Sequence, residues 1–135
     1  MVLEIQALTK PSSYRHSQLT TQGLARKRAL LTVAALEKYS SLKLGRSDIF
    51  VKSSFGLHVF EPAADLAIAL AIASSQLKKA LPKELCVFGE VGLNGEIKVV
   101  AGEEERRKHA QKLGLKPVSA KDYPYLSELL NALLS

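Results

Sequence analysis

A chain of 135 residues, 47% hydrophobic and 24% charged, is long enough for one compact domain with a hydrophobic core and too short for two of ordinary size. Its formal net charge of +6 suggests a polyanionic partner such as nucleic acid, with a merely soluble basic surface as the alternative. The single cysteine, Cys86, excludes an internal disulfide and is typical of a reducing compartment. The sequence shows neither a secretory leader nor a long apolar run, so we expect a cytoplasmic protein without a membrane partner.

The positive charge is concentrated in the first 60 residues, which carry nine lysines and arginines against three acidic residues. Residues 61–135 carry ten of each. Between Ile5 and Leu36 the chain has no acidic side chain at all. One-sided charge of this kind is typical of a surface that meets nucleic acid.

The N-terminal half is predicted to contain two main strands and one helix. Alternation over residues 2–8 predicts a strand, and a break at residues 10–13 leads into a polar, basic loop that runs to residue 22. Thr20 or Thr21 is expected to cap a helix that ends near Tyr39. Residues 48–52 predict the second strand, and residues 56–60 are expected to continue the sheet. The buried side of the helix is expected to comprise Leu24, Leu30, Leu31, Val33, Ala34, Ala35 and Leu36.

The C-terminal half begins with a helix that is apolar on nearly every face. Pro62 suits its first turn, and the helix is expected to run to about Gln76 as a central buried element. Residues 87–100 predict two strands joined around Asn94 and Gly95, a strong hairpin signal. A charged helix over residues 103–113 capped by Gly114, a short strand near residues 117–120 and a last helix over residues 125–134 complete an α+β domain.

The common catalytic and metal-binding patterns do not occur. No Gly-Lys-Ser or Gly-Lys-Thr is found, so the chain itself is not expected to hydrolyse ATP through a P-loop. The three histidines are isolated from one another and from Cys86, which argues against a metal site. We interpret His58 as structural and Cys86 as a buried small apolar residue. Glu61 and Asp65 suggest a carboxylate pair, but an aspartate near a helix N-terminus ordinarily serves free backbone N–H groups.

Several motifs occur along nearly the whole chain in the order found in one protein family. They are Leu3-Glu4-Ile5-Gln6-Ala7-Leu8, Arg28-Ala29-Leu30-Leu31, Leu36-Glu37-Lys38, Glu61-Pro62-Ala63-Ala64-Asp65-Leu66-Ala67, Phe88-Gly89-Glu90-Val91-Gly92-Leu93, Gly95-Glu96-Ile97, Glu105-Arg106-Arg107 and Lys112-Leu113-Gly114. Together they resemble the C-terminal Lon-protease-like domain of bacterial RadA (Sms) proteins. The resemblance implies an α+β fold of the Lon proteolytic-domain type, with residues 1–135 as a single domain excised from a longer RadA-type ATPase.

The resemblance also implies that the proteolytic chemistry has been lost. In Lon-type Ser-Lys proteases, Ala63 would be the nucleophilic serine and Arg106, 43 residues further on, would be the lysine base. Alanine carries no nucleophile, and a guanidinium that stays protonated cannot act as a general base. A protease that uses an unrecognised nucleophile is the alternative from another functional class.

The function implied by the resemblance is that of a non-catalytic module in a recombination and DNA-repair ATPase. It would contribute sequence-independent binding of duplex or branched DNA and assembly of a hexamer, and a pure assembly scaffold without DNA contact is the alternative. The parent protein is expected to be a DNA-dependent ATPase, with ATP, Mg²⁺ and Zn²⁺ bound by its other domains and no cofactor in this one. The candidate phosphate contacts are Lys10, Arg15, Arg26, Lys27 and Arg28.

Three features bear on these candidate contacts. Arg28 has an alternative role, in which it pairs with a carboxylate across a subunit boundary. Tyr14 is the one aromatic residue within the basic group, which favours duplex contact over base stacking. The chain also departs from the family pattern at residues 17–19, at Phe55 and at His58, where arginines, a glycine and a basic residue are frequent.

Overall fold

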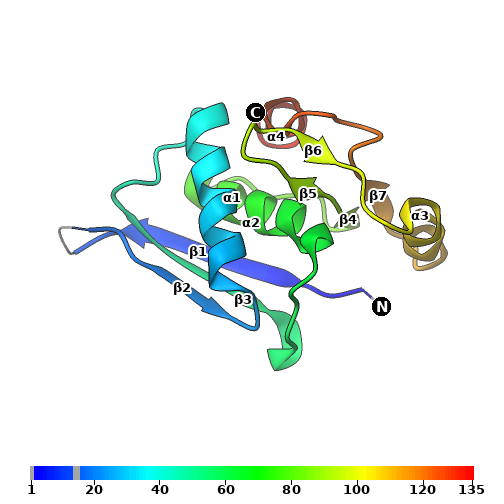
Figure 1. Ribbon diagram of the computed structural model, residues 1–135, viewed down its shortest axis with the longest axis horizontal. Coiled ribbons are helices and arrows are strands. Elements are labelled where there is room, and N and C mark those ends of the chain that lie inside the picture. Colours follow the sequence, from blue (N-terminus) through cyan, green and yellow to red (C-terminus); the bar gives the residue numbers. More distant parts are fainter. Residues whose placement is uncertain (1, 14–15) are drawn as a thin grey trace.

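The computed structural model describes residues 2–13 and 16–135, and its N-terminal half contains a three-stranded sheet in the order β1-β3-β2 (Figure 1). β1 (Ile5–Pro11) runs antiparallel to β3 (Ser47–Ser53), and β2 (Leu19–Gln22) runs parallel to β3. Side chains alternate between the two faces of a strand, so residues in register share a face. Val51 and its neighbours in register lie on the inner face, and Phe50 and its neighbours lie on the exposed outer face.

Two helices form the core together with the inner face of the sheet. α1 (Arg26–Tyr39) contacts β2 and α2, and α2 (Asp65–Leu77) contacts β1, β3 and α1. α2 occupies the middle of the molecule, between the sheet and the C-terminal elements (Figure 1). Leu66 and Ile72 in α2 are completely buried, and full burial of such a side chain contributes about 1.5–3 kcal/mol. The apolar composition of α2 is therefore explained by its central position.

The C-terminal half adds two small sheets and two helices. β4 (Leu85–Val87) pairs parallel with β7 (Lys116–Val118), and β5 (Glu90–Val91) pairs antiparallel with β6 (Ile97–Lys98). α3 (Glu103–Lys112) contacts β7, and α4 (Leu126–Leu134) packs against α2 and α1. Two short 3-10 turns, η1 (Ser54–Gly56) and η2 (Pro62–Ala64), lie between β3 and α2. The chain is a small α+β domain with mixed sheets.

From residue 47 onward, the predicted elements are confirmed except for the continuation of the sheet over residues 56–60. The strand near residues 48–52, the buried helix that follows Pro62, the charged helix from Glu103 and the last helix are all present. The hairpin around Asn94 and Gly95 is also confirmed, although its strands β5 and β6 are only two residues long. Gly95 adopts a φ of +81°, and a Cβ there would lie 2.8 Å from Cγ of Tyr39 in α1. The turn therefore requires glycine both for its backbone and for its packing.

The prediction was wrong for the segment between the first strand and the first helix. β1 continues through Pro11, which is tolerated because it ends a strand at the edge of the sheet. β2 lies within the segment predicted as a loop, so Thr20 and Thr21 are strand residues and not helix caps. α1 begins later, after Ala25, whose methyl group cannot accept a hydrogen bond from the helix. Within the described residues, the segment 56–60 extends the sheet only by an isolated bridge between Leu24 and Val59.

The orientation of α1 also differs from the prediction. Leu30 and Leu31 are 40% and 53% exposed, whereas Ala29 and Ala35 are almost completely buried. α1 is therefore oriented with these two alanines toward the core and the two leucines toward solvent. Among the described residues, no helix is long and apolar enough to cross a membrane.

Candidate functional site

The first turn of α1 carries three consecutive basic residues, Arg26, Lys27 and Arg28. The chain turns sharply before the helix at Gly23, where φ is +77° and a Cβ would lie 2.4 Å from the carbonyl oxygen of Leu57. The first turn holds no acidic residue. Cations near a helix N-terminus oppose the helix dipole, so helix stability does not explain this group of charges.

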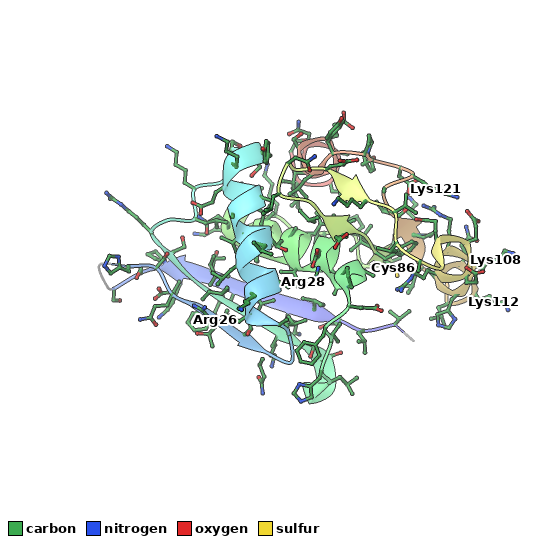
Figure 2. The ribbon with its side chains drawn as sticks, in the orientation of Figure 1. Arg26, Arg28, Cys86, Lys108, Lys112 and Lys121 are labelled. Carbon is green, nitrogen blue, oxygen red and sulfur yellow. The ribbon has the colours of Figure 1, made fainter. Side chains whose placement is uncertain are left out.

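These side chains have different surroundings, and Figure 2 labels two of them, Arg26 and Arg28. Arg26 is exposed, and its Nε donates a hydrogen bond at 3.2 Å to the carbonyl oxygen of Leu19 in β2, an edge strand of the sheet. Lys27 is exposed as well. Arg28 turns toward the protein, where its Nη1 lies 3.1 and 2.9 Å from the two carboxylate oxygens of Asp65. Arg26 and Lys27 are therefore more accessible to an external anion than Arg28.

Asp65 joins three elements of the fold. It is the first residue of α2, its side chain is only 3% exposed, and its Oδ2 also accepts the N–H of Val91 in β5 at 3.1 Å. Burial raises the pKa of this carboxyl above its ordinary value, while the hydrogen bonds from Arg28 and Val91 act in the opposite direction. The sequence suggested that Asp65 would accept hydrogen bonds from the N-terminal N–H groups of its own helix. Its carboxylate instead bonds to Arg28 in α1 and to Val91 in β5.

The surroundings of Arg28 bear on its alternative role at a subunit boundary. The carboxylate that it contacts belongs to its own chain, and Glu90 lies 3.8 Å from the same Nη1 atom. Arg28 therefore connects α1 to α2 within the domain. Whether it also reaches phosphate stays a prediction.

The remaining candidate contacts lie elsewhere. Lys10 is an exposed residue of β1 in register with Asp48, so it lies on the sheet and not on α1. Arg15, Tyr14 and the side chain of Phe55 fall outside the described residues. The described candidates therefore form two groups, one on the outer face of the sheet and one at the start of α1, and their contact with phosphate is still a prediction.

Ala63 and Arg106 belong to elements that are linked through Glu61, the residue before η2. Ala63 belongs to η2, is 5% exposed, and accepts the N–H of Gly89 at 3.0 Å. Arg106 belongs to α3, and its Nη1 and Nη2 lie 3.2 and 3.4 Å from the two carboxylate oxygens of Glu61, two residues before Ala63. Its Nε donates to the carbonyl oxygen of Ala101 at 2.9 Å. The guanidinium is thus held beside η2 in the two-point geometry that suits a carboxylate.

The ion pairs of Glu61 and Asp65 bear on the suggestion that these two residues form a carboxylate pair. Glu61 is half exposed and binds Arg106, whereas Asp65 is buried and binds Arg28. The two carboxylates are paired with different arginines, which leaves no support for a shared carboxylate pair.

A further polar cluster at α3 was not predicted from the sequence. The Oε2 atom of Glu103 accepts hydrogen bonds from Nε of Arg107 at 3.3 Å and from Oγ of Ser119 at 2.9 Å. Arg107 also donates from Nη2 to Oδ2 of Asp122 at 2.7 Å. The i,i+4 spacing of Glu103 and Arg107 predicts an ion pair along the helix. Their contacts with Ser119 and Asp122, which follow β7, depend on the tertiary fold and could not be predicted from spacing. The cluster ties α3 to the segment that follows β7.

His58 and Cys86 are not placed in a reactive site. His58 is exposed, and its ring stacks on that of Phe60 with the centroids 5.8 Å apart. Cys86 is half-buried, and burial raises the pKa of its thiol, which lowers the thiolate fraction needed for reactivity. In residues 2–13 and 16–135, no group of three or more His, Cys, Asp or Glu side chains could hold a metal ion.

The family model described as subunit ChlI of Mg-chelatase matches residues 25–120, which is more than half of the chain. The chain belongs to the ChlI family. The match begins at the N-terminus of α1 and includes η2 and α3, so it contains Arg26, Lys27, Ala63 and Arg106. Lys10 and β1 precede it.

Relatives of this ChlI-family domain include proteins named DNA repair protein RadA. The one from Aquifex aeolicus (strain VF5) is 44% identical over 116 residues, which cover 86% of this chain and 26% of the relative. The one from Streptococcus pneumoniae (strain ATCC BAA-255 / R6) is 44% identical over 114 residues, which cover 84% of this chain and 27% of the relative. The one from Synechocystis sp. is 39% identical over 116 residues, which cover 86% of this chain and 23% of the relative. The chain spans about a quarter of the length of these relatives.

Proposed function

We propose that this ChlI-family domain is the non-proteolytic, Lon-like domain of a RadA-type recombination and DNA-repair ATPase. In that protein it would contribute sequence-independent DNA binding and assembly of a hexamer. The observation that carries the proposal is the 44% identity to two proteins named DNA repair protein RadA, over at least 84% of the chain. The parent protein would be a cytoplasmic, DNA-dependent ATPase whose ATP, Mg²⁺ and Zn²⁺ are bound by other domains.

Two residues support a non-proteolytic role. Ala63 offers no nucleophile at the position that the Lon resemblance assigns to serine. Arg106, at the position of the lysine base, is engaged with Glu61 at 3.2 Å, and a guanidinium cannot act as a general base. At the position where the Lon resemblance places a lysine base, this chain has an arginine in an ion pair with Glu61. This pairing is consistent with a structural role for Arg106.

DNA contact is supported by exposed positive charge on two neighbouring parts of the domain. Arg26 and Lys27 lie at the start of α1, and Lys10 lies on the outer face of the sheet. Phosphate contact needs only cations on a reachable surface, so these residues suffice for binding without sequence preference. We assign Arg28 a supporting role in which it holds the first turn of α1 on α2.

A pure assembly scaffold is the second candidate function. The observation that favours it is the exposure of Leu30 and Leu31, which lie two turns or less from the basic residues on α1. Exposed leucines on a helix are suited to a protein contact. A test must therefore separate DNA binding from assembly.

The test compares two charge-reversal variants of the same chain. Arg26→Glu with Lys27→Glu alters the proposed contact, and Lys108→Glu with Lys112→Glu makes the same change of net charge on α3, at the far side of the domain from α1 (Figure 2). Binding of a labelled DNA duplex is followed by fluorescence anisotropy, and the assembly state by light scattering.

We expect the α1 variant to lose duplex affinity with its assembly state unchanged, while the α3 variant retains most of its affinity. Equal losses in both variants would indicate an unspecific effect of net charge and would contradict the proposed contact. Loss of assembly in the α1 variant, without any duplex binding by the native chain, would favour the scaffold.

A further inference from the structure

The outer face of the three-stranded sheet carries no helix among the described residues, and it combines an aromatic side chain with cations. Leu8 in β1, Phe50 in β3 and Thr20 in β2 form a row in register, with Leu8 57% and Phe50 37% exposed. The row on one side of it consists of Gln6, Lys52 and Gln22, and the row on the other side contains Lys10 and Asp48.

This face is hollowed. A groove of about 720 Å³ runs over Phe50, Leu8 and Lys52 and reaches Ser75 and Leu81 beside β1. A second hollow of about 470 Å³ shares Gln6, Gln22 and Lys52 with the first and extends past them toward η1. The two hollows adjoin each other at these three shared residues.

The charges on this face are placed on both sides of Phe50. Lys52 lies two residues further along β3, about 7 Å away at the usual rise of a strand, and Lys10 lies two residues from Leu8 in the opposite direction. In the row of Lys10, Asp48 is buried and its Oδ1 accepts the N–H of Gln18 at 3.0 Å, so Lys10 is the exposed charged group of that row. The exposed carboxylate of Glu4 at the margin of the second hollow is engaged by Nε2 of Gln6 at 2.7 Å.

The surroundings of the groove favour nucleic acid over an extended peptide. A peptide that binds a sheet usually adds to a free strand edge, but the β1 edge is covered by α2, where Oγ of Ser75 accepts the N–H of Thr9 at 2.9 Å. At the β2 edge, the carbonyl oxygen of Leu19 is taken by Arg26. An exposed aromatic ring between two cations instead matches a flat base between two phosphates.

We propose that the outer face of the sheet binds single-stranded nucleic acid, with an unpaired base stacked on Phe50 and Leu8 and its flanking phosphates at Lys52 and Lys10. Arg26 at the β2 edge extends the positive charge from this face to the start of α1. The inference rests on the proposed DNA-binding function and specifies its ligand. It differs from the sequence-based preference for duplex, because the strand register brings Phe50 between two lysines that are far apart in the chain. A duplex cannot use Phe50, since its bases are already stacked.

The experiment uses the fact that the chain contains no tryptophan. In a Phe50→Trp variant, the new indole is the only one in the protein, and its emission reports stacking directly. The variant is titrated with an oligothymidylate of about 15 nucleotides, within the length that such surfaces bind, and with a blunt duplex of the same length. We expect quenching by the single strand and unchanged emission with the duplex.

Affinity measurements on conservative variants complete the test. Phe50→Leu keeps an apolar side chain but removes the aromatic face, and we expect it to weaken single-strand binding by about 5- to 150-fold. Phe50→Tyr should retain binding, and Phe60→Leu serves as the matched control because Phe60 is an exposed phenylalanine outside this face. Lys52→Gln should reduce the slope of log affinity against log salt by about 0.7.

The outcomes separate this inference from the proposed function. If neither oligonucleotide binds the native chain, both are overturned. If the native chain binds DNA while Phe50→Leu keeps full affinity and the indole of Phe50→Trp does not respond, the sheet face is excluded and the function proposed for α1 stands. Quenching by the single strand together with loss in Phe50→Leu supports both.

Discussion

Nη1 of Arg28 lies 2.9 Å from Oδ2 of Asp65, and this ion pair joins the first turn of α1 to the first residue of α2. The same oxygen of Asp65 accepts the N–H of Val91 in β5, so three elements meet at one buried carboxylate. The basic turn that we propose to contact DNA is thereby anchored to the core. Arg28 acts on Arg26 and Lys27 by holding the turn that carries them.

Removal of the Asp65 carboxylate is expected to destabilise the domain strongly. In Asp65→Ala, Arg28 loses its partner and the N–H of Val91 loses its acceptor; because Arg28 is 30% exposed, we expect a loss between the roughly 1 kcal/mol of a surface pair and the roughly 3–5 kcal/mol of a fully buried one. Asp65→Asn should cost less than Asp65→Ala, because an amide oxygen in the place of Oδ2 still accepts from Val91 and Arg28, while the charge and the contact at Oδ1 are lost. The free energy of unfolding from urea titration measures both effects. Glu61→Ala, which removes the exposed partner of Arg106, is the control and should cost about 0–1 kcal/mol. Equal losses in Asp65→Ala and Glu61→Ala would contradict this account.

The pH dependence of stability should show the contribution of Asp122. Desolvation alone would raise the pKa of its carboxyl, but the hydrogen bonds from Arg107 and from the N–H of Ser119 outweigh it, and the pKa lies below its ordinary value of 3.8. Asp122 therefore stabilises the fold above that value, and the contribution is lost as the pH falls through the lowered pKa. The difference in unfolding free energy between the native chain and Asp122→Asn should shrink on acidification. A difference that stays constant with pH would argue against the contact with Arg107.

The turn between β5 and β6 should not tolerate a side chain at Gly95. In Gly95→Ala, the methyl group would lie within 3.0 Å of three atoms of Tyr39, in addition to the penalty of about 1–2 kcal/mol for a left-handed backbone. Gly114→Ala is a matched control, since Gly114 has a φ of +75° but nothing within 4 Å of the added methyl group. Thermal unfolding should show a larger loss for Gly95→Ala than for Gly114→Ala. Similar losses would mean that Tyr39 moves aside at little cost.

The native chain should not hydrolyse peptides. Ala63 and Arg106 supply neither a nucleophile nor a base, so a fluorogenic peptide incubated with the native chain should remain intact. The double variant Ala63→Ser with Arg106→Lys restores both groups and serves as the comparison in the same assay. Hydrolysis by the native chain, at a rate above that of a heat-denatured sample, would contradict the non-proteolytic assignment.

The elements that local patterns determine were predictable from the sequence. The apolar composition of α2, the Asn94-Gly95 turn and the charged α3 each follow from a contiguous stretch of residues. β2 was missed because it is short and polar, and it exists through pairing with β3, which follows it by more than 20 residues. The exposed face of α1 was assigned wrongly because its orientation is set by tertiary packing, which buries Ala29 and Ala35 and leaves Leu30 and Leu31 exposed.

The candidate site was predicted in composition but not in arrangement. The basic residues at the start of α1 were identified from charge alone, whereas the pairing of Arg28 with Asp65 depends on tertiary contacts between residues 37 positions apart. The place of Phe50 between Lys10 and Lys52 likewise follows from the register of β1 and β3. Sequence patterns report local spacing, so relationships of this kind are visible only in the folded domain.

The salt dependence of duplex binding by the native chain tests the central claim most directly. Each phosphate contact contributes about −0.9 to the slope of log affinity against log salt, so contacts from Lys10, Arg26 and Lys27 predict a slope of about −2.7. Fluorescence anisotropy of a labelled duplex at several salt concentrations gives this slope. A slope near the predicted value would support phosphate contact by these cations. Absence of binding at low salt, or binding that does not change with salt, would contradict it.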